Sequence, residues 1–516
     1  MLSVTTYIST DVASIPLMWI IPLALYLLSF IIVFARSSWA APTDLYNSFF
    51  VEVLNRPPVP LHRLFRIALP IALLPLVDVL ANEVSQPLAR ILPLHLFCFF
   101  AVALLCHGEI ARDRPGSSQL TEFYLWMAVG GVLGGIFNAL LAPVLFSTVA
   151  EYPITLVIAC LVMPPLRDEV DEIKRILDIV YPLCMALLAV TLVIGLRSRN
   201  HHYVATDHIN FVTFSILTAV CCLFALRPIR FGLGVAVILA TSVLCTNADH
   251  ALLATERSFF GVHKVVYQPA WKMHVFIHGD ILHGEQSFVP GHMRDPLTYY
   301  HPDGPIGQFF AAFSGEKAKR SVGVVGLGTG TLACYAQPGQ DWTFYEIDPQ
   351  VERIARDPAL FTYLRDCRAN YRVVLGDARL SLADQPDGRH DLIVLDAYSS
   401  DAIPVHLITL QALQLYARKL SPHGVIAFHI SNQHLLLEPV VAELAQAAGM
   451  VSLDQIDEAS DEFPGKFTSQ WMLVARRDAD FGPLLASPRW HRAQLQPGMR
   501  VWTDDYSSIL SVFKWK

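Results

Sequence analysis

The chain has 516 residues, of which 53% are apolar and 16% charged, and its mean hydropathy is +0.42. These values are unusual for a soluble protein, and the length allows several domains. The net charge of −7, the pI near 6.2 and the lack of a basic stripe argue against a nucleic-acid-binding protein.

Long apolar runs fill the first half of the chain. The first of them, Ser14–Ala35, is too long for the core of a signal peptide and predicts a membrane span, which needs about 20 apolar residues. Similar runs predict a transmembrane domain of seven or eight helices within residues 1–247. The candidate spans are Ser14–Ala35, Phe65–Ala81, Ile91–Cys106, Phe123–Ala142, Pro143–Met163, Ile179–Leu196, Ile209–Leu226 and Phe231–Cys245.

The number of spans decides the topology. The positive-inside rule places the basic loop with Arg36, Arg56 and Arg63 in the cytoplasm. With eight spans that rule puts the C-terminal half outside, and with seven it falls inside. The fourth and fifth runs are separated only by Ala142-Pro143 and a short polar patch at Glu151, so one of them could be re-entrant. We expect a cytoplasmic C-terminal half, because the chemistry expected of it uses a cytoplasmic metabolite.

Cysteine spacing bears on metals and disulfides. Seven of the nine cysteines lie in the apolar half, and the chain has no CxxC pair and no Cys/His spacing typical of zinc. We therefore expect a reduced chain without a metal site.

The pattern changes to short alternating segments between Glu256 and His301. Glycine breaks at Gly279 and Gly284 indicate a β-hairpin region. The segment PLTYYHPDGPIGQFFAAF follows and predicts a loop and then a helix. Residues 248–318 are thus expected to form a small β-rich subdomain with a connecting helix.

Strands and helices alternate from residue 319 to residue 516, which predicts a parallel, doubly wound sheet. The buried strand Ser321–Leu327 runs into the glycine turn GLGTG, formed around Gly326, Gly328 and Gly330, and then into a helix. Such glycines permit a tight turn and let a ligand approach the backbone.

Acidic residues end the next three predicted strands. Glu346 lies twenty residues after Gly326 and suits a ribose diol, and Asp377, before Ala378, can accept from an adenine amine. Asp396 ends the fourth strand, LIVLD. The main alternative is a dinucleotide-binding domain, but GLGTGTLA lacks the third glycine of GxGxxG in its usual place.

The succession GLGTG, YEID, GDA and LDA resembles the class I methyltransferase fold, which binds S-adenosylmethionine-type nucleotides. RSFFGVHKV, HGDILHGEQ, PLTYYH, LDAYSSDAIPVH and WTDDYSSIL resemble spermidine synthases (polyamine aminopropyltransferases). The resemblance is closer to bacterial membrane-fused spermidine synthase-like proteins, in which a multi-span domain precedes the synthase domain. It implies an integral protein of the bacterial inner membrane, with an adenosyl-sulfonium-binding domain over residues 319–516.

The resemblance also implies roles for individual residues. The donor is a sulfonium and the acceptor a polyamine, so carboxylates hold cations and a base deprotonates the attacking amine. Asp396 would be that catalytic base, and Asp401 would hold the other end of the acceptor. The expected donor-binding residues are Gly326, Gly328, Gly330, Glu346, Asp377, Ala378 and Gln286, and the expected substrate residues are Tyr300, His301, Asp401, Asp504 and Asp505.

Two of these assignments have structural alternatives. Asp401 could instead be the N-cap of the following helix, a role that Ser399 or Ser400 could also fill. Asp504 and Asp505 could lie in a surface turn before the last strand.

The sequence also departs from the family pattern. Thr329 stands where soluble spermidine synthases carry an aspartate in the glycine loop, the family's DSSD is stretched to DAYSSD, and Phe463 replaces a tyrosine. The neutral Thr329 allows ordinary S-adenosylmethionine as the donor. The register of Gln286 is open, because HGDILHGEQ offers two HG steps.

The sequence thus predicts a membrane-anchored aminopropyltransferase that uses decarboxylated S-adenosylmethionine as co-substrate and makes spermidine from putrescine. No permanently bound cofactor is expected, and the expected partners are a polyamine, the lipid bilayer and a second copy in a homodimer. One alternative is a methyl- or aminocarboxypropyl-transferase that uses S-adenosylmethionine. Another is a transporter or sensor whose nucleotide domain only binds.

Overall fold

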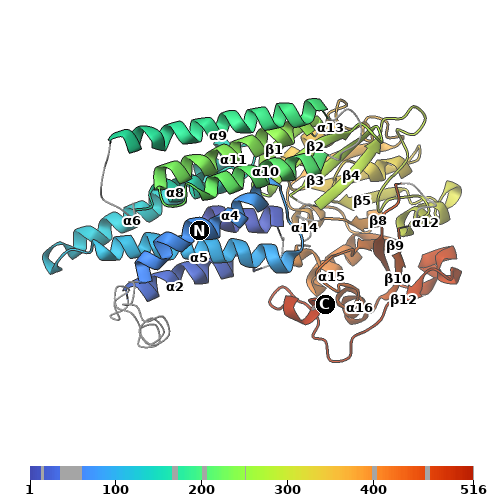
Figure 1. The fold of residues 1–516 in the computed structure, drawn as a ribbon. Coiled ribbons are helices and arrows are strands. Elements are labelled where there is room, and N and C mark those ends of the chain that lie inside the picture. Colours follow the sequence, from blue (N-terminus) through green and yellow to red (C-terminus); the bar gives the residue numbers. More distant parts are fainter. Residues whose placement is uncertain are drawn as a thin grey trace. The chain divides into compact units, whose positions relative to one another are not determined.

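The computed structural model describes residues 1–12, 17–34, 61–164, 172–199, 206–249, 251–279, 281–397, 404–459 and 465–514 (Figure 1). Within them the chain packs as two compact units, one from residues 1–12 and 17–251 and the other from residues 252–516. The finer division into three domains stays a prediction.

The first unit is helical throughout its described residues. Its short turns include two π-helical segments, η1 (Ile8–Val12) and η4 (Phe137–Leu141), and a 3₁₀ turn, η3 (Ser117–Gln119). Its α-helices are α1 (Leu2–Tyr7), α2 (Ile20–Phe34), α4 (Leu61–Ala81), α5 (Leu88–Arg112), α6 (Leu120–Ile136), α7 (Ala142–Leu145), α8 (Glu151–Leu161), α9 (Glu172–Arg199), α10 (Thr206–Cys222) and α11 (Pro228–Asp249).

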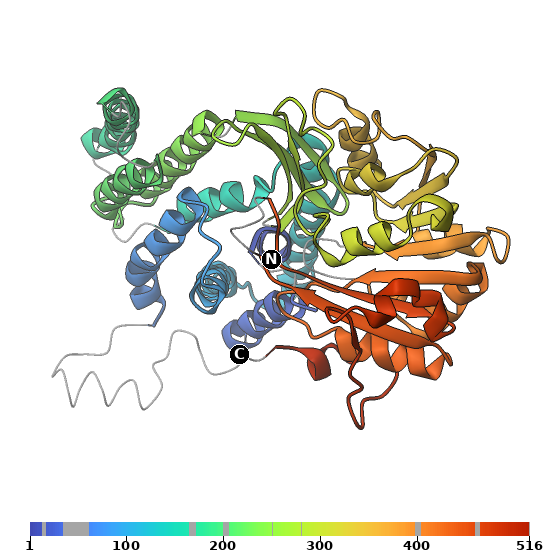
Figure 2. The same ribbon diagram turned by 90° about the vertical axis from the view of Figure 1, so that its right-hand side faces the viewer.

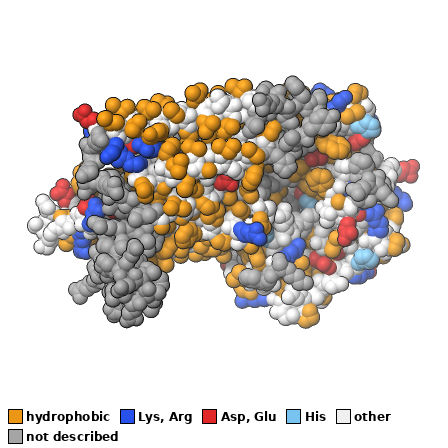
Figure 3. Space-filling model, in the orientation of Figure 1, with side chains coloured by type: hydrophobic (Ala, Val, Ile, Leu, Met, Phe, Trp, Pro, Cys, Tyr) orange, Lys and Arg blue, Asp and Glu red, His pale blue; other side chains and the backbone are white. Residues whose placement is uncertain are grey.

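Four stretches of the first unit are long and apolar enough to cross a membrane. They are Leu88–Arg112, Ser117–Leu145, Glu172–Gly195 and Pro228–Cys245, and four shorter apolar helices accompany them in the described residues. Large apolar side chains cover the outside of these helices, and charged side chains gather at one end of the helical unit and over the second unit (Figure 3). Such a surface is typical of helices that face lipid. The predicted number of seven or eight spans stays a prediction.

The break between the fourth and fifth apolar runs lies later than expected. The helical path continues through Ala142 and Pro143 to Leu145, and α8 begins only at Glu151. Pro143 does not interrupt the path because it falls in the first turn of α7, where the missing N–H has no partner to lose.

The second unit begins with the predicted β-hairpin region, a four-stranded sheet in the order β1-β2-β3-β4 (Figure 2). Neighbouring strands from β2 to β4 are antiparallel, with a register shift between Phe276 and Ile277. The strands are β1 (Ala251–Ser258), β2 (Gly261–Gln268), β3 (Met273–His278) and β4 (Ile281–Ser287).

An eight-stranded sheet follows, in the order β12-β10-β11-β9-β8-β5-β6-β7. Five strands from β9 to β7 run parallel, and β11 pairs antiparallel with both β9 and β10. The strands are β5 (Ser321–Val325), β6 (Asp341–Glu346), β7 (Asn370–Leu375), β8 (His390–Leu395), β9 (Leu420–His429), β10 (Val451–Asp457), β11 (Ser469–Ala475) and β12 (His491–Arg492). The short edge strand β12 also pairs antiparallel with β10. The order of the other seven strands, with β11 antiparallel among them, is that of the class I methyltransferase-like fold, so the predicted fold class is confirmed.

Two apolar layers cover the large sheet because its strand residues alternate between faces. Val324 and Phe344 belong to one layer, and Tyr345 and Ile393 belong to the other, beneath α14, α15 and α16. The helices are α12 (Pro305–Ala312), α13 (Pro349–Arg356), α14 (Ala378–Ala383), α15 (Leu410–Lys419) and α16 (Glu438–Ala447). Helix α12 is the connecting helix that the sequence predicts.

The helix expected after the glycine turn is a short 3₁₀ helix and not an α-helix. Only a 3₁₀ helix, η6 (Thr331–Tyr335), separates Gly330 from the approach to β6. Pro338 and Gly339 follow within a few residues and stop any longer helix. The glycine turn therefore has no α-helix N-terminus to offer a ligand.

Candidate active site

A cavity of about 800 Å³ lies at the carboxyl ends of the parallel strands of the large sheet. This is the edge at which open α/β sheets bind ligands, and the volume lies within the range of roughly 300–1,000 Å³ usual for small-molecule sites. Residues of β2, β3 and β4 line it as well. Seven of the predicted site residues line it, namely Tyr300, Gly326, Gly328, Glu346, Asp377, Ala378 and Asp396.

The glycine turn needs its glycines for two separate reasons. Gly326, Gly328 and Gly330 all have positive φ, which other residues adopt at a cost. A Cβ on Gly326 would also stand 2.2 Å from the carbonyl oxygen of Asp396. Gly330 packs against Leu364 and does not line the cavity. The turn therefore lies directly against the loop that follows β8.

Glu346 ends β6 with its carboxylate buried and held by the backbone. Oε2 accepts the N–H of Leu327 at 2.9 Å, and Oε1 accepts the N–H of Asp348 at 2.9 Å. Burial raises the pKa of Glu346, and these backbone hydrogen bonds oppose the rise. Glu346 also lines the cavity, so its position is compatible with the predicted ribose contact.

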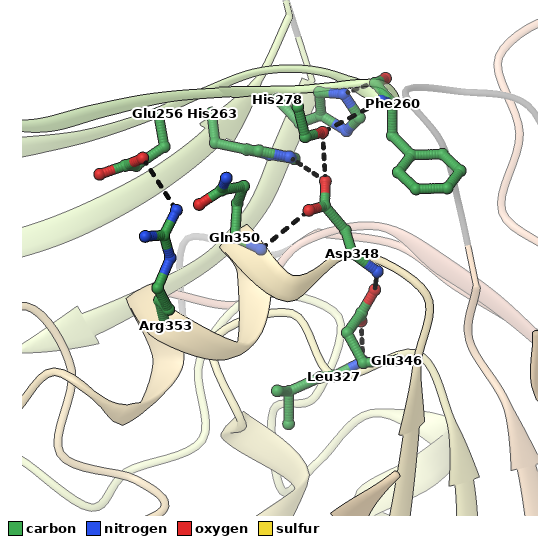
Figure 4. A network of polar contacts seen from close by, with 10 residues as sticks. Glu256, Phe260, His263, His278, Leu327, Glu346, Asp348, Gln350 and Arg353 are labelled. Carbon is green, nitrogen blue, oxygen red and sulfur yellow. Dashed lines mark hydrogen bonds and ion pairs between the residues drawn. The ribbon is translucent and has the colours of Figure 1, made fainter. Parts of the chain in front are cut away.

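Asp348 ties the small sheet to the nucleotide edge (Figure 4). Its carboxylate accepts from the Ser258 hydroxyl, from His263 Nε2 at 2.8 Å and from the Gln350 N–H at 2.8 Å. Burial by itself would raise the pKa of Asp348, but the hydrogen bonds from His263 and Ser258 hold it below its usual value. Asp348 is not among the predicted site residues, and it also caps α13.

Three histidines of the small sheet also line the cavity and were missed. The rings of His263 and His278 are 4.4 Å apart, and those of His278 and His283 are 5.3 Å apart. Burial lowers the pKa of His278 to about 4 and the pKa of His283 well below its usual value. A signal was present in the sequence, because all three stand in strands whose alternation was recognised.

Asp377 caps α14 and lines the cavity. Its Oδ1 accepts the N–H of Leu380 at 2.9 Å, and its Oδ2 lies 3.0 Å from His406 Nε2. One oxygen is therefore committed to the helix, while the other lies between His406 and the cavity. Ala378, the first residue of α14, lines the same wall.

Asp396 follows β8, and both of its oxygens have partners. The hydroxyl of Tyr300 donates to Oδ2 at 2.5 Å, and His429 Nδ1 lies 2.7 Å from Oδ1. The Asp396 side chain is 5% exposed. Burial and the neighbouring Asp396 charge raise the pKa of Tyr300 well above its usual value, so Tyr300 acts as a hydroxyl donor. The structure thus brings together two predicted site residues, Tyr300, which precedes the glycine turn in the chain, and Asp396, which follows it.

Gln286 does not reach the cavity. It is fully buried, and its amide donates to Met293 O and Thr362 Oγ1 at 2.7 Å each while it accepts the Thr362 N–H at 2.8 Å. All of these bonds hold β4 against neighbouring segments. The bulge in β4, where Gly284 opposes Phe276, turns this end of the strand inward.

His301 also lies outside the cavity lining. Its Nδ1 accepts the N–H of Asp303 at 3.2 Å, which shapes the turn before α12. The neighbouring residue Tyr300 points to Asp396 instead. Both residues lie in a turn, in which Tyr300 N–H donates to Leu297 O and His301 N–H donates to Thr298 O.

The pair near the C-terminus behaves as the alternative interpretation expected. Asp504 forms a bidentate ion pair with Arg379, with both distances at 2.7 Å, and also accepts from Thr409 Oγ1. Asp505 is exposed, and neither residue lines the cavity. The segment is a turn, followed by a 3₁₀ helix, η9 (Ile509–Val512), rather than by the expected strand.

Asp401 and Phe463 lie outside the described residues, so their predicted positions stay predictions. Thr329 is described, and its side chain is buried. Its Oγ1 lies 2.7 Å from Thr331 Oγ1, and a Cβ on Gly284 would approach it to 2.6 Å. Thr329 therefore packs against the small sheet and does not line the cavity.

Comparison with known proteins bears on the family. No protein-family model matches the chain. Over 108 residues it is 34% identical to the polyamine aminopropyltransferase of Vibrio vulnificus (strain CMCP6), a match that covers 20% of this chain. The chain spans about a third of the length of that curated relative, 35%.

Three solved structures give low TM-scores against this chain. A probable spermidine synthase from Corynebacterium glutamicum ATCC 13032 is 16% identical over 49% of this chain and 97% of its own, with a TM-score of 0.36. Spermidine synthase from Thermotoga maritima is 14% identical over 51% and 84%, with a TM-score of 0.33. Spermidine synthase in complex with the transition state analogue AdoDATO is 15% identical over 48% and 81%, with a TM-score of 0.35.

The curated match and the strand order agree with the predicted resemblance. The C-terminal part of the chain is spermidine synthase-like and polyamine aminopropyltransferase-like, and the described residues of the N-terminal part include four apolar helices of spanning length.

Proposed function

We propose that the protein is a membrane-anchored aminopropyltransferase that uses decarboxylated S-adenosylmethionine and a polyamine such as putrescine. The observation that carries this proposal is the buried carboxylate of Asp396 at the sheet edge. Its observed partners are a tyrosine hydroxyl and an imidazole, and neither is a lysine or an arginine that would neutralise its charge. Such a carboxylate suits an incoming ammonium group.

The donor would bind along the strand ends. Glu346 would accept hydrogen bonds from the ribose hydroxyls, and Asp377 would accept from the adenine amine beside Ala378. The backbone of Gly326 and Gly328 would lie under the sulfonium. Among the described residues, four carboxylates line the cavity, from Glu346, Asp348, Asp377 and Asp396, and they favour a cationic donor.

The transfer would be a direct displacement at carbon. Asp396 takes a proton from the attacking ammonium, and the freed lone pair then forms a C–N bond as the C–S bond breaks. The electron pair of that bond passes to sulfur and leaves methylthioadenosine, a neutral thioether, beside the new spermidine. Positioning of the two reactants supplies most of the rate enhancement. Asp401 remains our candidate for the second ammonium of the acceptor.

One observation favours a second candidate, transfer of a methyl or aminocarboxypropyl group from ordinary S-adenosylmethionine. Thr329 occupies the place of the family's aspartate, and its side chain is buried away from the cavity. The glycine turn therefore has no carboxylate that would repel the carboxylate of S-adenosylmethionine.

The test is to incubate the purified full-length protein with putrescine and each donor in turn and to identify the products by mass. Spermidine with methylthioadenosine supports the first candidate. A methylated or aminocarboxypropylated amine supports the second and contradicts the first. Donor binding without turnover of any amine contradicts both and agrees with a sensor or transporter.

We further propose that the catalytic unit faces the cytoplasm, where its co-substrate is made. Four long and four shorter apolar helices precede it within the part of the chain that the structure describes. Labelling of single introduced cysteines from each side of inverted vesicles would count the crossings. An odd number agrees with an N-terminus outside and a catalytic unit inside, whereas eight crossings, with the basic loops inside, contradict the proposal.

A further inference from the structure

His429 stands beside Asp396 at the same edge of the sheet. It is the last residue of β9, which runs parallel to β8 with Leu395 opposite Phe428. The next residue of each strand is then Asp396 or His429, and their side chains meet at 2.7 Å. The contact follows from the strand register and does not depend on a loop.

The His429 ring is clamped on both faces. Tyr299 stacks on one side, with ring centroids 4.5 Å apart, and Trp471 of β11 stacks on the other at 4.6 Å. The His429 side chain is 5% exposed. A ring held in this way cannot swing out of the plane that points Nδ1 at Asp396.

The hydrogen bonds around His429 have a definite direction. The backbone N–H of Gln470 donates to Ser431 Oγ at 2.8 Å, and Ser431 Oγ lies 2.8 Å from His429 Nε2. A carboxylate only accepts, so the Nδ1 that faces Asp396 Oδ1 carries a proton. In the neutral ring Nε2 is then the acceptor, and the Ser431 hydroxyl donates to it.

We propose that His429 is a positioning residue for Asp396, which fixes the catalytic carboxylate by donating from Nδ1, with Ser431 holding the ring in that tautomer. This inference rests on the proposed function, because it assigns a role within the same reaction. His429 also lines the cavity, but in the proposed chemistry it acts through Asp396.

The carboxylate of Asp396 accepts one hydrogen bond on each of its two oxygens, which restrains it more than a single donor would. Tyr300 on Oδ2 and His429 on Oδ1 together fix the rotation of the carboxylate about its Cβ–Cγ bond. The carboxylate is therefore held in one orientation at the cavity that Asp396 lines. Both partners donate to the carboxylate, and neither is a lysine or an arginine.

The kinetic test compares two substitutions at one position. His429→Phe keeps a flat ring between Tyr299 and Trp471 but has no donor, and kcat should fall about 100-fold with the donor Kd unchanged. His429→Gln keeps an N–H donor and should recover kcat to within about tenfold of the wild type. The proposal is overturned if His429→Phe leaves kcat within about twofold of the wild type, or if His429→Gln is as slow as His429→Phe.

A matched control separates positioning from packing. His274 is also buried and stacked, on Phe288 at 3.9 Å, but its Nδ1 bonds to Leu360 O and it does not line the cavity. His274→Phe should lower the melting temperature while leaving kcat within about twofold. Loss of turnover in both phenylalanine variants would assign the effect to packing and overturn the proposal.

A second measurement needs no turnover and no foldable phenylalanine variant. Nitrogen-15 histidine spectra of the full-length protein in detergent, with the His429→Gln spectrum subtracted, report the tautomer of His429. We expect a protonated Nδ1, which becomes mixed with the other tautomer in Ser431→Ala, and a bare Nδ1 in the wild type overturns the proposal. If the protein turns over no amine, the proposed function is contradicted. The tautomer of His429 can still be measured in that case, so its positioning of Asp396 is tested separately.

Discussion

Asp396 and Asp504 stand in two motifs of the same family resemblance, yet their surroundings differ. Asp396 is 5% exposed, and its partners are the Tyr300 hydroxyl and the His429 imidazole. The Asp504 side chain is 41% exposed and is bound by the guanidinium of Arg379 through both oxygens. One carboxylate lines a cavity, and the other neutralises a fixed cation of the protein.

The difference teaches which motif carboxylates can serve a cationic substrate. Hydrogen bonds from Arg379 lower the pKa of Asp504 to about 2, so its charge is permanent but already matched. Donors without a fixed charge hold Asp396 in place and leave its charge for the ligand. Availability of charge, more than the presence of an aspartate, separates a site from a structural ion pair.

The largest effect is expected at Asp396. Asp396→Asn removes the proton acceptor but keeps the volume, and turnover of any accepted amine should fall about 10³-fold. Donor affinity, measured by calorimetry, should stay within about threefold because Glu346 and the glycine turn are untouched. Asp384→Asn, an exposed change at the end of α14, serves as the control. An Asp396→Asn variant with wild-type turnover would remove the catalytic role from Asp396.

A third carboxylate sharpens the comparison, because Asp454 in β10 is buried without a cation. Burial first, and then the Glu438 charge, raises the pKa of Asp454 to about 7, although Gln470 Nε2 donates to it. In the unfolded chain its pKa is about 3.9. Between those two values the folded state binds the extra proton, so stability falls as the pH rises from about 4 to about 7, by on the order of 3 kcal/mol.

The check is thermal melting of the full-length protein at several pH values across that window. Asp454→Asn cannot titrate and should flatten the profile between the two limits. Equal pH dependence in the wild type and the variant would show that Asp454 titrates normally in the fold.

A smaller effect is expected at Glu346, which belongs with Asp396 in the comparison. Glu346→Gln places an NH₂ group against one of the backbone N–H groups of Leu327 and Asp348, and the donor Kd should rise about 10–100-fold. Asp341→Asn, at the exposed start of the same strand, is the matched control and should not alter the Kd. Unchanged donor binding in Glu346→Gln would exclude the ribose contact.

The smallest effect is expected at Asp504. Because the folded pKa is depressed, its stabilising contribution is present above pH 4 and is lost as the pH falls from about 4 to about 2. The pair is partly exposed, so Asp504→Asn should cost about 1 kcal/mol or less and leave turnover unchanged. Melting curves and product assays check both parts, and a large loss of turnover would return Asp504 to the list of substrate residues.

Features set by the local chain could be predicted from the sequence. Glu346, Asp377 and Asp396 each follow an apolar strand, and a parallel sheet brings such ends together. The same rule applies to His429, which follows the apolar residues VIAF, but the predicted site contains only carboxylates at the strand ends. His429 was therefore missed although its signal was present.

Features set by distant partners could not be predicted. The state of Asp504 depends on Arg379, which lies 125 residues away in the chain. Gln286 was expected in the site because its motif matched, but the bulge opposite Phe276 and the bonds to Thr362 decide its direction. A motif names the residue, whereas the packing around it decides which way the side chain faces.

The contact between Gly326 and Asp396 limits how the donor preference of this protein could be engineered. Any side chain at position 326 would collide with the carbonyl of Asp396 at 2.2 Å, so a change aimed at the donor would also move the base. A Cβ at Gly328 would meet only His283 O at 3.3 Å and Tyr300 Oη at 4.0 Å. Its φ of 53° is tolerated best by asparagine and aspartate among the other residues. Position 328 is therefore where a new charge can enter the donor pocket with the base left in place.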